Sequence, residues 1–204
     1  MKKSSLIILS ICILLIGLYY GYSTIRTLNG NPIAMPRAKN LVIEYINLAY
    51  PNDDFQIGKG TYAVTYGNYY FDVEDSKGIK VNELLVPKNL TLIEDTMQTD
   101  ALNEKVADYL ATHTTIETIE VNGTVSFAKE MNKSETIWVT VSGNNLSKEK
   151  LADFGQSIYE WSKNHAPSLN KLIVDATNVS NNESYRLSLD KKQLTESNYI
   201  KFIE

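Results

Sequence analysis

Two histidines, His113 and His165, are the residues of this chain that acid–base or metal chemistry would most readily use. Each is predicted to lie at the C-terminal end of a helix, where a positive charge interacts favourably with the helix dipole. Neither belongs to an H-x-x-x-H or H-x-x-E-H pattern, and no cysteine follows Cys12. We therefore interpret both histidines as structural and predict no metal site.

Other motifs for catalysis or cofactor binding are absent from the sequence. There is no G-x-S-x-G and no Walker loop, and Gly58-Lys59-Gly60 is too short to cradle phosphates. The acidic group of Asp72, Glu74 and Asp75 does not match the register of a calcium loop, and Asp53-Asp54 is an isolated pair. We therefore expect no catalytic residue and no cofactor, although a Ser-His-Asp triad assembled by the fold stays open.

One aromatic set has a composition typical of binding surfaces, because tyrosine combines apolar area with a hydroxyl group. Strand alternation predicts that most of the set faces the core, whereas Tyr70 shares a face with Asp72 and Glu74 and is expected to be exposed. Trp138 shares a face with two threonines, which places it outside the core or beneath the C-terminal tail. The aromatic set consists of Tyr62, Tyr66, Tyr69, Tyr70 and Phe71.

The distribution of charge argues against nucleic-acid binding. The net charge is −4, but five of the 20 basic residues and no acidic residue precede position 40. From Asn40 onward, 15 basic residues face 24 acidic ones, a balance of −9. Such a surface lacks the lysine and arginine excess that neutralises phosphates, so we predict no nucleic-acid partner.

The N-terminal region contains an uncharged apolar run from Leu6 to Tyr22. A helix of about 20 apolar residues is long enough to cross a bilayer, so residues 6–25 are predicted to form a transmembrane helix. Residues 1–5 are then a cytoplasmic tail and residues 26–36 a stalk, with the C-terminal domain outside the cell. A cleaved signal peptide and a buried helix of a soluble protein are the alternatives.

The remainder is predicted to be α+β, with two small modules, residues 37–97 and residues 98–204, that each pack a helix on an antiparallel sheet. In the first module, a helix over residues 37–50 precedes a hairpin at Gly67-Asn68 and a turn at residues 75–78.

In the second module, Thr99 is a plausible N-cap and Asn122-Gly123 a two-residue hairpin turn. Ser147 is predicted to cap a further helix that ends near Asn164 and precedes strands at residues 171–177 and 185–189.

The stretch TYAVTYGNYYFDVEDSKGIKV, from Thr61 to Val81, resembles a PepSY-type module, a family with a Y-x-V strand, a glycine turn and a D-x-x-x-G turn, because Tyr62-Ala63-Val64 and Asp75 to Gly78 lie in matching places. The whole chain is similar to the YfjL-like single-pass membrane proteins of Gram-positive bacteria, through its short basic tail, its apolar run and the Gly30–Pro32 and Tyr50-Pro51 segments. This resemblance implies a location and an architecture, but no activity.

These observations together favour a non-enzymatic domain, anchored in the membrane and facing the cell envelope, that binds a protein or a peptide. One alternative is an envelope hydrolase, a peptidase or wall hydrolase, whose carboxylates are dispersed in the sequence. The other is a scaffold subunit of a membrane complex that contacts its partners through the anchor.

Overall fold

The computed structural model describes residues 3–31, 33–113, 116 and 118–204. Residues 1 and 2 of the expected cytoplasmic tail lie outside this part, as do the side chains of residues 3–9, 28, 29, 113 and 129. The described residues form four α helices and ten strands, an α+β fold. The chain divides into two compact units, Met1–Ile93 (unit 1) and Glu94–Glu204 (unit 2).

The helix at the N-terminus corrects one prediction. Helix α1 (Lys3–Asn29) covers the expected transmembrane segment, residues 6–25. Within the part of the chain that the structure describes, however, no helix has the length and apolarity that a bilayer crossing requires. The described side chains of α1, from Ser10 to Thr27, include three tyrosines and Arg26, which lower the apolarity of its second half. The prediction of a transmembrane helix is therefore wrong.

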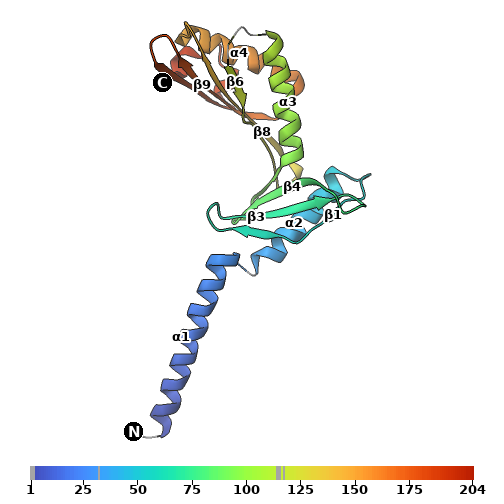
Figure 1. The fold of residues 1–204 in the computed structure, drawn as a ribbon, viewed down its shortest axis with the longest axis vertical. Coiled ribbons are helices and arrows are strands. Elements are labelled where there is room, and N and C mark those ends of the chain that lie inside the picture. Colours follow the sequence, from blue (N-terminus) through green and yellow to red (C-terminus); the bar gives the residue numbers. More distant parts are fainter. Residues whose placement is uncertain (1–2, 32, 114–115, 117) are drawn as a thin grey trace. The chain divides into compact units, whose positions relative to one another are not determined.

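Unit 1 packs helix α2 on antiparallel strands. Strand β3 pairs antiparallel with β1, β2 and β4. Its alternate residues Tyr69, Phe71 and Val73 are buried, and so are Val42 and Tyr45 of α2, which packs on this face (Figure 1). The elements are α2 (Ala34–Ala49), β1 (Gln56–Ile57), β2 (Thr61–Ala63), β3 (Asn68–Glu74) and β4 (Lys80–Pro87). A short strand, β5 (Leu92–Asp95), crosses the boundary between the units.

The β2–β3 hairpin has a longer turn than the sequence predicts. The turn spans residues 64–67, whereas a two-residue turn is expected at Gly67-Asn68. Gly67 adopts a φ of +67°, which glycine accommodates without strain. Asn68 instead belongs to β3 and pairs with Ala63.

Unit 2 is a mixed sheet rather than the antiparallel sheet that we predict for each module. Strand β8 pairs parallel with β9, and β10 returns antiparallel to β9. The physical reason is that α4 lies between β8 and β9 in the chain, and a crossover helix lets the second strand start at the same end as the first. The elements are α3 (Thr96–His113), β6 (Thr118–Val121), β7 (Thr124–Ala128), β8 (Lys133–Gly143), α4 (Lys148–His165), β9 (Leu169–Asn178), β10 (Glu183–Asp190) and the 3₁₀ helices η1 (Lys129–Met131), η2 (Gln193–Thr195) and η3 (Ile200–Phe202).

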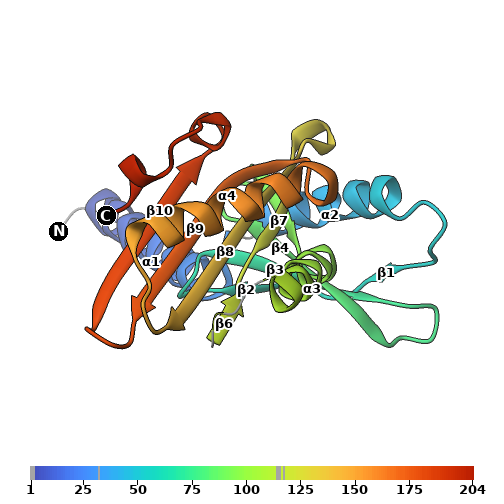
Figure 2. The ribbon, with the colours of Figure 1, turned by 90° about the horizontal axis from the view of Figure 1, so that it is seen from above.

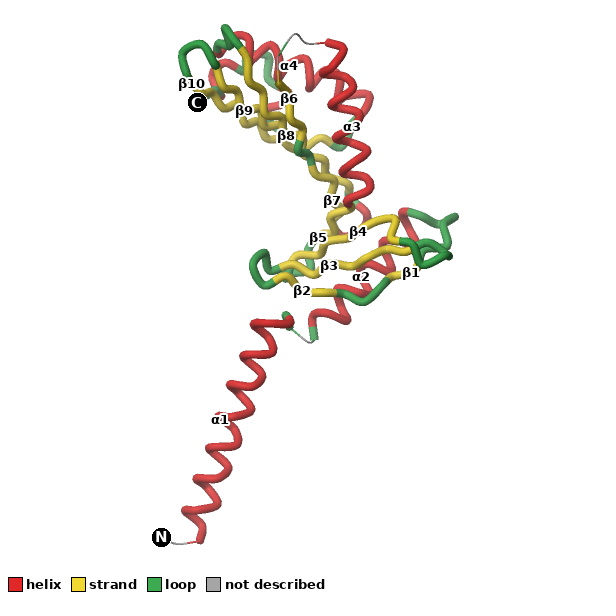
Figure 3. The backbone as a smooth tube through the Cα atoms, viewed as in Figure 1, coloured by secondary structure: helices red, strands yellow, loops and turns green. Residues whose placement is uncertain are grey.

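The Asn122-Gly123 segment is an interruption rather than a hairpin turn. Strands β6 and β7 follow one another along the same edge of β8, and both pair with it (Figure 3). A Cβ atom on Gly123 would lie 2.7 Å from Asn103 Oδ1 and 2.8 Å from the Thr136 carbonyl oxygen. The glycine is thus required by the close approach of α3 and β8 at this point.

Both helices of unit 2 cover the same face of its sheet (Figure 2). Helix α3 packs on β6 and β7, α4 packs on β9 and β10, and the two helices are joined by a hydrogen bond from the Tyr109 hydroxyl to the Ser157 carbonyl oxygen (3.3 Å). The core between them and the sheet includes Val139, Val174 and Leu187, each fully buried. The residues that alternate with these point to the opposite face, which neither α3 nor α4 covers.

Candidate functional site

Trp138 lies on the helix-free face of the unit 2 sheet. It follows Ile137 and precedes Val139, which are both fully buried on the other face, and it is itself 40% exposed. A tryptophan with this much accessible surface in the middle of a strand is unusual, because the residue is highly buried on average. The prediction that Trp138 lies outside the core is confirmed.

The strand register brings Asp175 and Arg186 to this tryptophan. Trp138 on β8 is opposite Ile173 on β9, so Asp175 is its diagonal neighbour, and Arg186 on β10 is directly opposite Asp175. The indole Nε1–H donates to Asp175 Oδ2 at 2.8 Å. Arg186 Nε lies 3.4 Å from Asp175 Oδ1, and its guanidinium is 5.7 Å from the centre of the indole ring.

These three residues, Trp138, Asp175 and Arg186, form what we call the Trp138 cluster. Asp175 uses one oxygen for each partner, so a single carboxylate fixes both the indole and the guanidinium. The guanidinium also lies within the distance at which a cation is attracted to an aromatic ring. Neither Asp175 nor Arg186 belongs to a recognisable sequence motif. Their proximity to Trp138 depends on pairing between strands that are far apart in the chain.

The backbone of Arg186 is held from its other side as well. Its N–H donates to the Glu204 carbonyl oxygen at 3.1 Å, and the Glu204 N–H donates to the Arg186 carbonyl oxygen at 3.0 Å. Leu187 and Ile203 form an isolated antiparallel bridge beside these bonds. Arg186 is therefore held by β9 on one side and by the C-terminal residues Ile203 and Glu204 on the other.

The face around the cluster carries small polar side chains together with three charged ones, those of Glu120, Lys171 and Asp190. Ile173 pairs with Trp138 on the neighbouring strand and is the apolar residue of this face beside the cluster; it is only 7% exposed. Trp138 and Arg186 are both exposed on this face and can be reached by another molecule. The surrounding polar residues are Thr136, Thr140, Ser142, Thr177, Ser184 and Ser188.

The predicted aromatic set of unit 1 divides into core and surface. Tyr69 and Phe71 are buried as expected, and Tyr62 is half-buried with its ring centre 5.0 Å from that of Tyr69. Tyr66 is 74% exposed, because it belongs to the four-residue turn, and so the prediction that it faces the core is wrong. Tyr70 lies on the face opposite to Tyr69 as expected, but it is half-buried beside Leu85 rather than exposed.

His165 and Asp75, two of the residues singled out in the sequence, contact neighbouring groups of the chain. His165 stacks on Trp161, with ring centres 4.8 Å apart, and the side chain of His113 lies outside the described residues. Asp75 Oδ1 accepts the Lys77 and Ile79 N–H groups at 2.8 and 2.9 Å, and so shapes a turn. In the described part of the chain, no three histidine, cysteine or acidic side chains come together in a way that could hold a metal ion.

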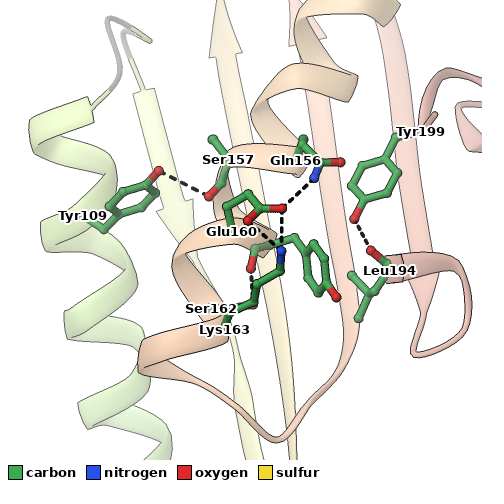
Figure 4. Close-up of polar contacts among 9 residues, drawn as sticks. Tyr109, Gln156, Ser157, Glu160, Ser162, Lys163, Leu194 and Tyr199 are labelled. Carbon is green, nitrogen blue, oxygen red and sulfur yellow. Dashed lines mark hydrogen bonds and ion pairs between the residues drawn. The ribbon is translucent and has the colours of Figure 1, made fainter. Parts of the chain in front are cut away.

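A cavity of about 240 Å³ lies beside the C-terminal end of α4. Lys163 at its rim is 2.6 Å from Glu160 Oε2, and this ammonium holds the pKa of the Glu160 carboxyl below its ordinary value (Figure 4). The same ammonium lies 4.9 Å from the centre of the Tyr159 ring. The cavity lies on the α4 side of unit 2 and is separate from the Trp138 cluster.

Comparison with known proteins places the two halves of the chain in one family. The domain family described as YfjL-like, N-terminal domain matches residues 1–101, and the one described as YfjL-like C-terminal domain matches residues 94–204. No curated protein and no solved structure matches the chain.

Proposed function

Since the chain belongs to the YfjL-like family, with both of its domains present, we propose that it is a binding protein whose C-terminal domain docks a protein partner on the helix-free face of its sheet. Trp138 and Arg186 are the central contacts of this interaction. The proposal retains the binding function expected from the sequence and assigns it to a surface.

The observation that carries the proposal is the fixed orientation of the exposed Trp138 ring. Tryptophan and arginine are enriched among the few residues that contribute most of the energy of protein interfaces. An exposed side chain normally loses conformational entropy when a partner immobilises it. In this protein, Asp175 already holds both Trp138 and Arg186, so that part of the cost is met before binding.

We further propose that residues 37–97 form a PepSY-like module. The order of a helix, α2, followed by antiparallel strands supports this assignment. A tight turn at residues 75–78 also supports it, since Gly78 has a φ of +76° and its N–H donates to the Asp75 carbonyl oxygen at 2.9 Å. This module contributes the exposed Tyr66 turn, but no cluster comparable with that of Trp138.

The alternative of a hydrolase has no comparable support. A hydrolase acting on glycosidic bonds would need two carboxylates about 5–10 Å apart in a cleft. The cavity beside α4 is lined by neither aspartate nor glutamate. We therefore put forward partner binding as the function.

A photocrosslinking experiment on the full chain tests the proposed face. A photoreactive phenylalanine analogue is introduced at Ser188, which is exposed on β10 in register with Ile173. The matched control carries the same analogue at Asp153, which is exposed on α4. We expect a discrete crosslinked protein from the Ser188 position in native extracts and none of that mass from the Asp153 position.

The affinity of the purified crosslinked protein for variants then tests the cluster itself. Truncation of a central interface tryptophan typically costs at least about 2 kcal/mol, so Trp138→Ala should weaken binding roughly 30-fold or more. Tyr66→Ala removes another exposed ring, in unit 1, and should leave the affinity unchanged. Equal affinity of Trp138→Ala and the natural chain, or crosslinking from both positions alike, would refute the proposed function.

A further inference from the structure

The cavity beside α4 is bounded by elements from three parts of unit 2. These are the last turn of α4, the start of β9 and the short helix η2. Ala166, Leu169 and Leu194 are at most 7% exposed and form an apolar wall. A dry apolar cavity of about 150 Å³ accommodates benzene, so about 240 Å³ has room for a branched aliphatic or phenyl group with a short substituent.

Two of the neutral hydroxyl groups in the cavity lining are already occupied as donors. The Ser162 hydroxyl donates to the Tyr159 carbonyl oxygen at 2.7 Å, and the Thr195 hydroxyl donates to the Lys192 carbonyl oxygen at 2.8 Å. Both bonds are local, within three residues along the chain. The remaining side-chain donors in the cavity lining are the Tyr159 hydroxyl and the ammonium groups of Lys163 and Lys191, and of these only the ammonium groups carry a positive charge.

The two lysines give the rim an excess of positive charge. Glu160 accepts from Lys163 through both of its oxygens, at 2.7 and 2.6 Å, which leaves a third N–H of this ammonium. Lys191, in contrast, forms no ion pair with any residue that the structure describes. A lysine in the last turn of α4 is explained by the helix dipole, but Lys191 comes from the segment between β10 and η2, where no such explanation applies.

We propose that this cavity binds a carboxylate attached to a compact apolar group. The apolar part would occupy the space against Leu169 and Leu194, and the carboxylate would lie at the rim beside Lys191. Both a free short-chain organic acid and the C-terminal residue of a peptide present this chemistry. The site is independent of the Trp138 cluster, because it lies on the α4 side of the sheet.

The test uses the full chain, labelled with ¹⁵N, and 4-methylpentanoate as the probe. Its amide, 4-methylpentanamide, has the same shape without the charge, and the tripeptide acetyl-Ala-Ala-Leu carries a similar group at a peptide terminus. We expect the acid to shift the backbone resonances of Leu169 and Leu194 and to bind more tightly than the amide. Lys191→Gln should weaken acid binding roughly two- to fivefold, the range of one exposed ion pair, while the adjacent Lys192→Gln should have no effect.

The relative affinities of the acid, the amide and the tripeptide decide whether the proposal holds. Binding of the acid with preference over the amide supports it, and the tripeptide then assigns the source as a peptide terminus if it binds or as a free acid if it does not. Absence of binding at millimolar acid overturns the proposal. Equal affinity of acid and amide, or an unchanged affinity of Lys191→Gln, also overturns it. None of these results depends on the protein partner of the Trp138 cluster.

Discussion

Replacement of Gly155 by alanine tests how closely α4 packs on the sheet of unit 2. Gly155 is buried on the side of α4 that faces β10. A Cβ atom at this position would come far inside the normal contact distance from Leu187 Cδ2, and would lie 3.5 Å from Tyr199 Cδ2. Leu187 is fully buried, so its side chain has little room to move away.

Two opposing effects determine the size of the change. Alanine is favoured over glycine within a helix by about 1 kcal/mol. Overpacking of a filled core costs roughly 1–3 kcal/mol, and a contact this close with a fully buried leucine belongs in the upper part of that range. We therefore expect Gly155→Ala to lower the free energy of unfolding by about 1–2 kcal/mol.

Urea unfolding followed by tryptophan fluorescence measures this effect. Both tryptophans of the chain, Trp138 and Trp161, lie in unit 2, so the signal reports on the unit that carries the substitution. A shift of the midpoint at constant slope gives the change in stability. The matched control is Leu187→Val, which shortens the opposing side chain.

The double variant isolates the contact between Gly155 and Leu187. Leu187→Val alone should cost about 1 kcal/mol, by analogy with the removal of one buried methylene. Combined with Gly155→Ala, it should cost less than the sum, with a coupling of roughly 0.5 kcal/mol or more. If Gly155→Ala instead stabilises the protein by about 1 kcal/mol, helix propensity alone governs the site and our packing argument is refuted.

Three other predictions follow from polar contacts. Glu135 is 2% exposed, lies 2.8 Å from Lys133 Nζ and accepts the Ser168 N–H, so Glu135→Ala should lower the free energy of unfolding by about 2 kcal/mol in the same urea assay. An NMR titration should give the Glu160 carboxyl a pKa below its ordinary value of 4.5 because of Lys163, and Lys163→Gln should raise that pKa. The contribution of this ion pair to the stability of the folded protein is present above pH 4.5 and is lost as the pH falls through the lowered pKa. Asp75→Ala removes the acceptor of two backbone N–H groups and should destabilise unit 1 by about 1 kcal/mol, which hydrogen exchange of the β3 and β4 amides would detect as faster exchange.

Local signals in the sequence account for the helices well. Ser147 is predicted to cap α4, and its hydroxyl oxygen accepts the Lys150 N–H at 3.3 Å. The end of this helix is predicted near Asn164 and lies at His165. Helix α3, in contrast, begins at Thr96 rather than after Thr99, because Asp95 Oδ1 accepts the Gln98 N–H at 3.1 Å and caps the helix earlier. Caps and periodicity act within a few residues, which is why the sequence shows them or shows a competing candidate nearby.

Hairpin signals were less reliable than helix signals in this chain. Asn-Gly at positions 122 and 123 is typical of a two-residue turn, yet both flanking strands pair with β8. The deciding interaction is the contact of Gly123 with Asn103 and Thr136, residues that are remote in sequence. A turn motif reports only the local preference of the backbone, and here the packing of α3 on the sheet overrides it.

The α+β class, the capped helix α4 and the exposed side of Trp138 could be predicted from the sequence, because each depends on periodicity or on residues close together in the chain. The parallel pairing of β8 with β9, which brings Asp175 and Arg186 to Trp138, is visible only in the folded protein. The same is true of the cavity that Lys163 and Lys191 share. These arrangements depend on the strand register and on the crossover through α4. Both are fixed by burial of the whole core, so no short segment of the sequence contains a pattern that predicts them.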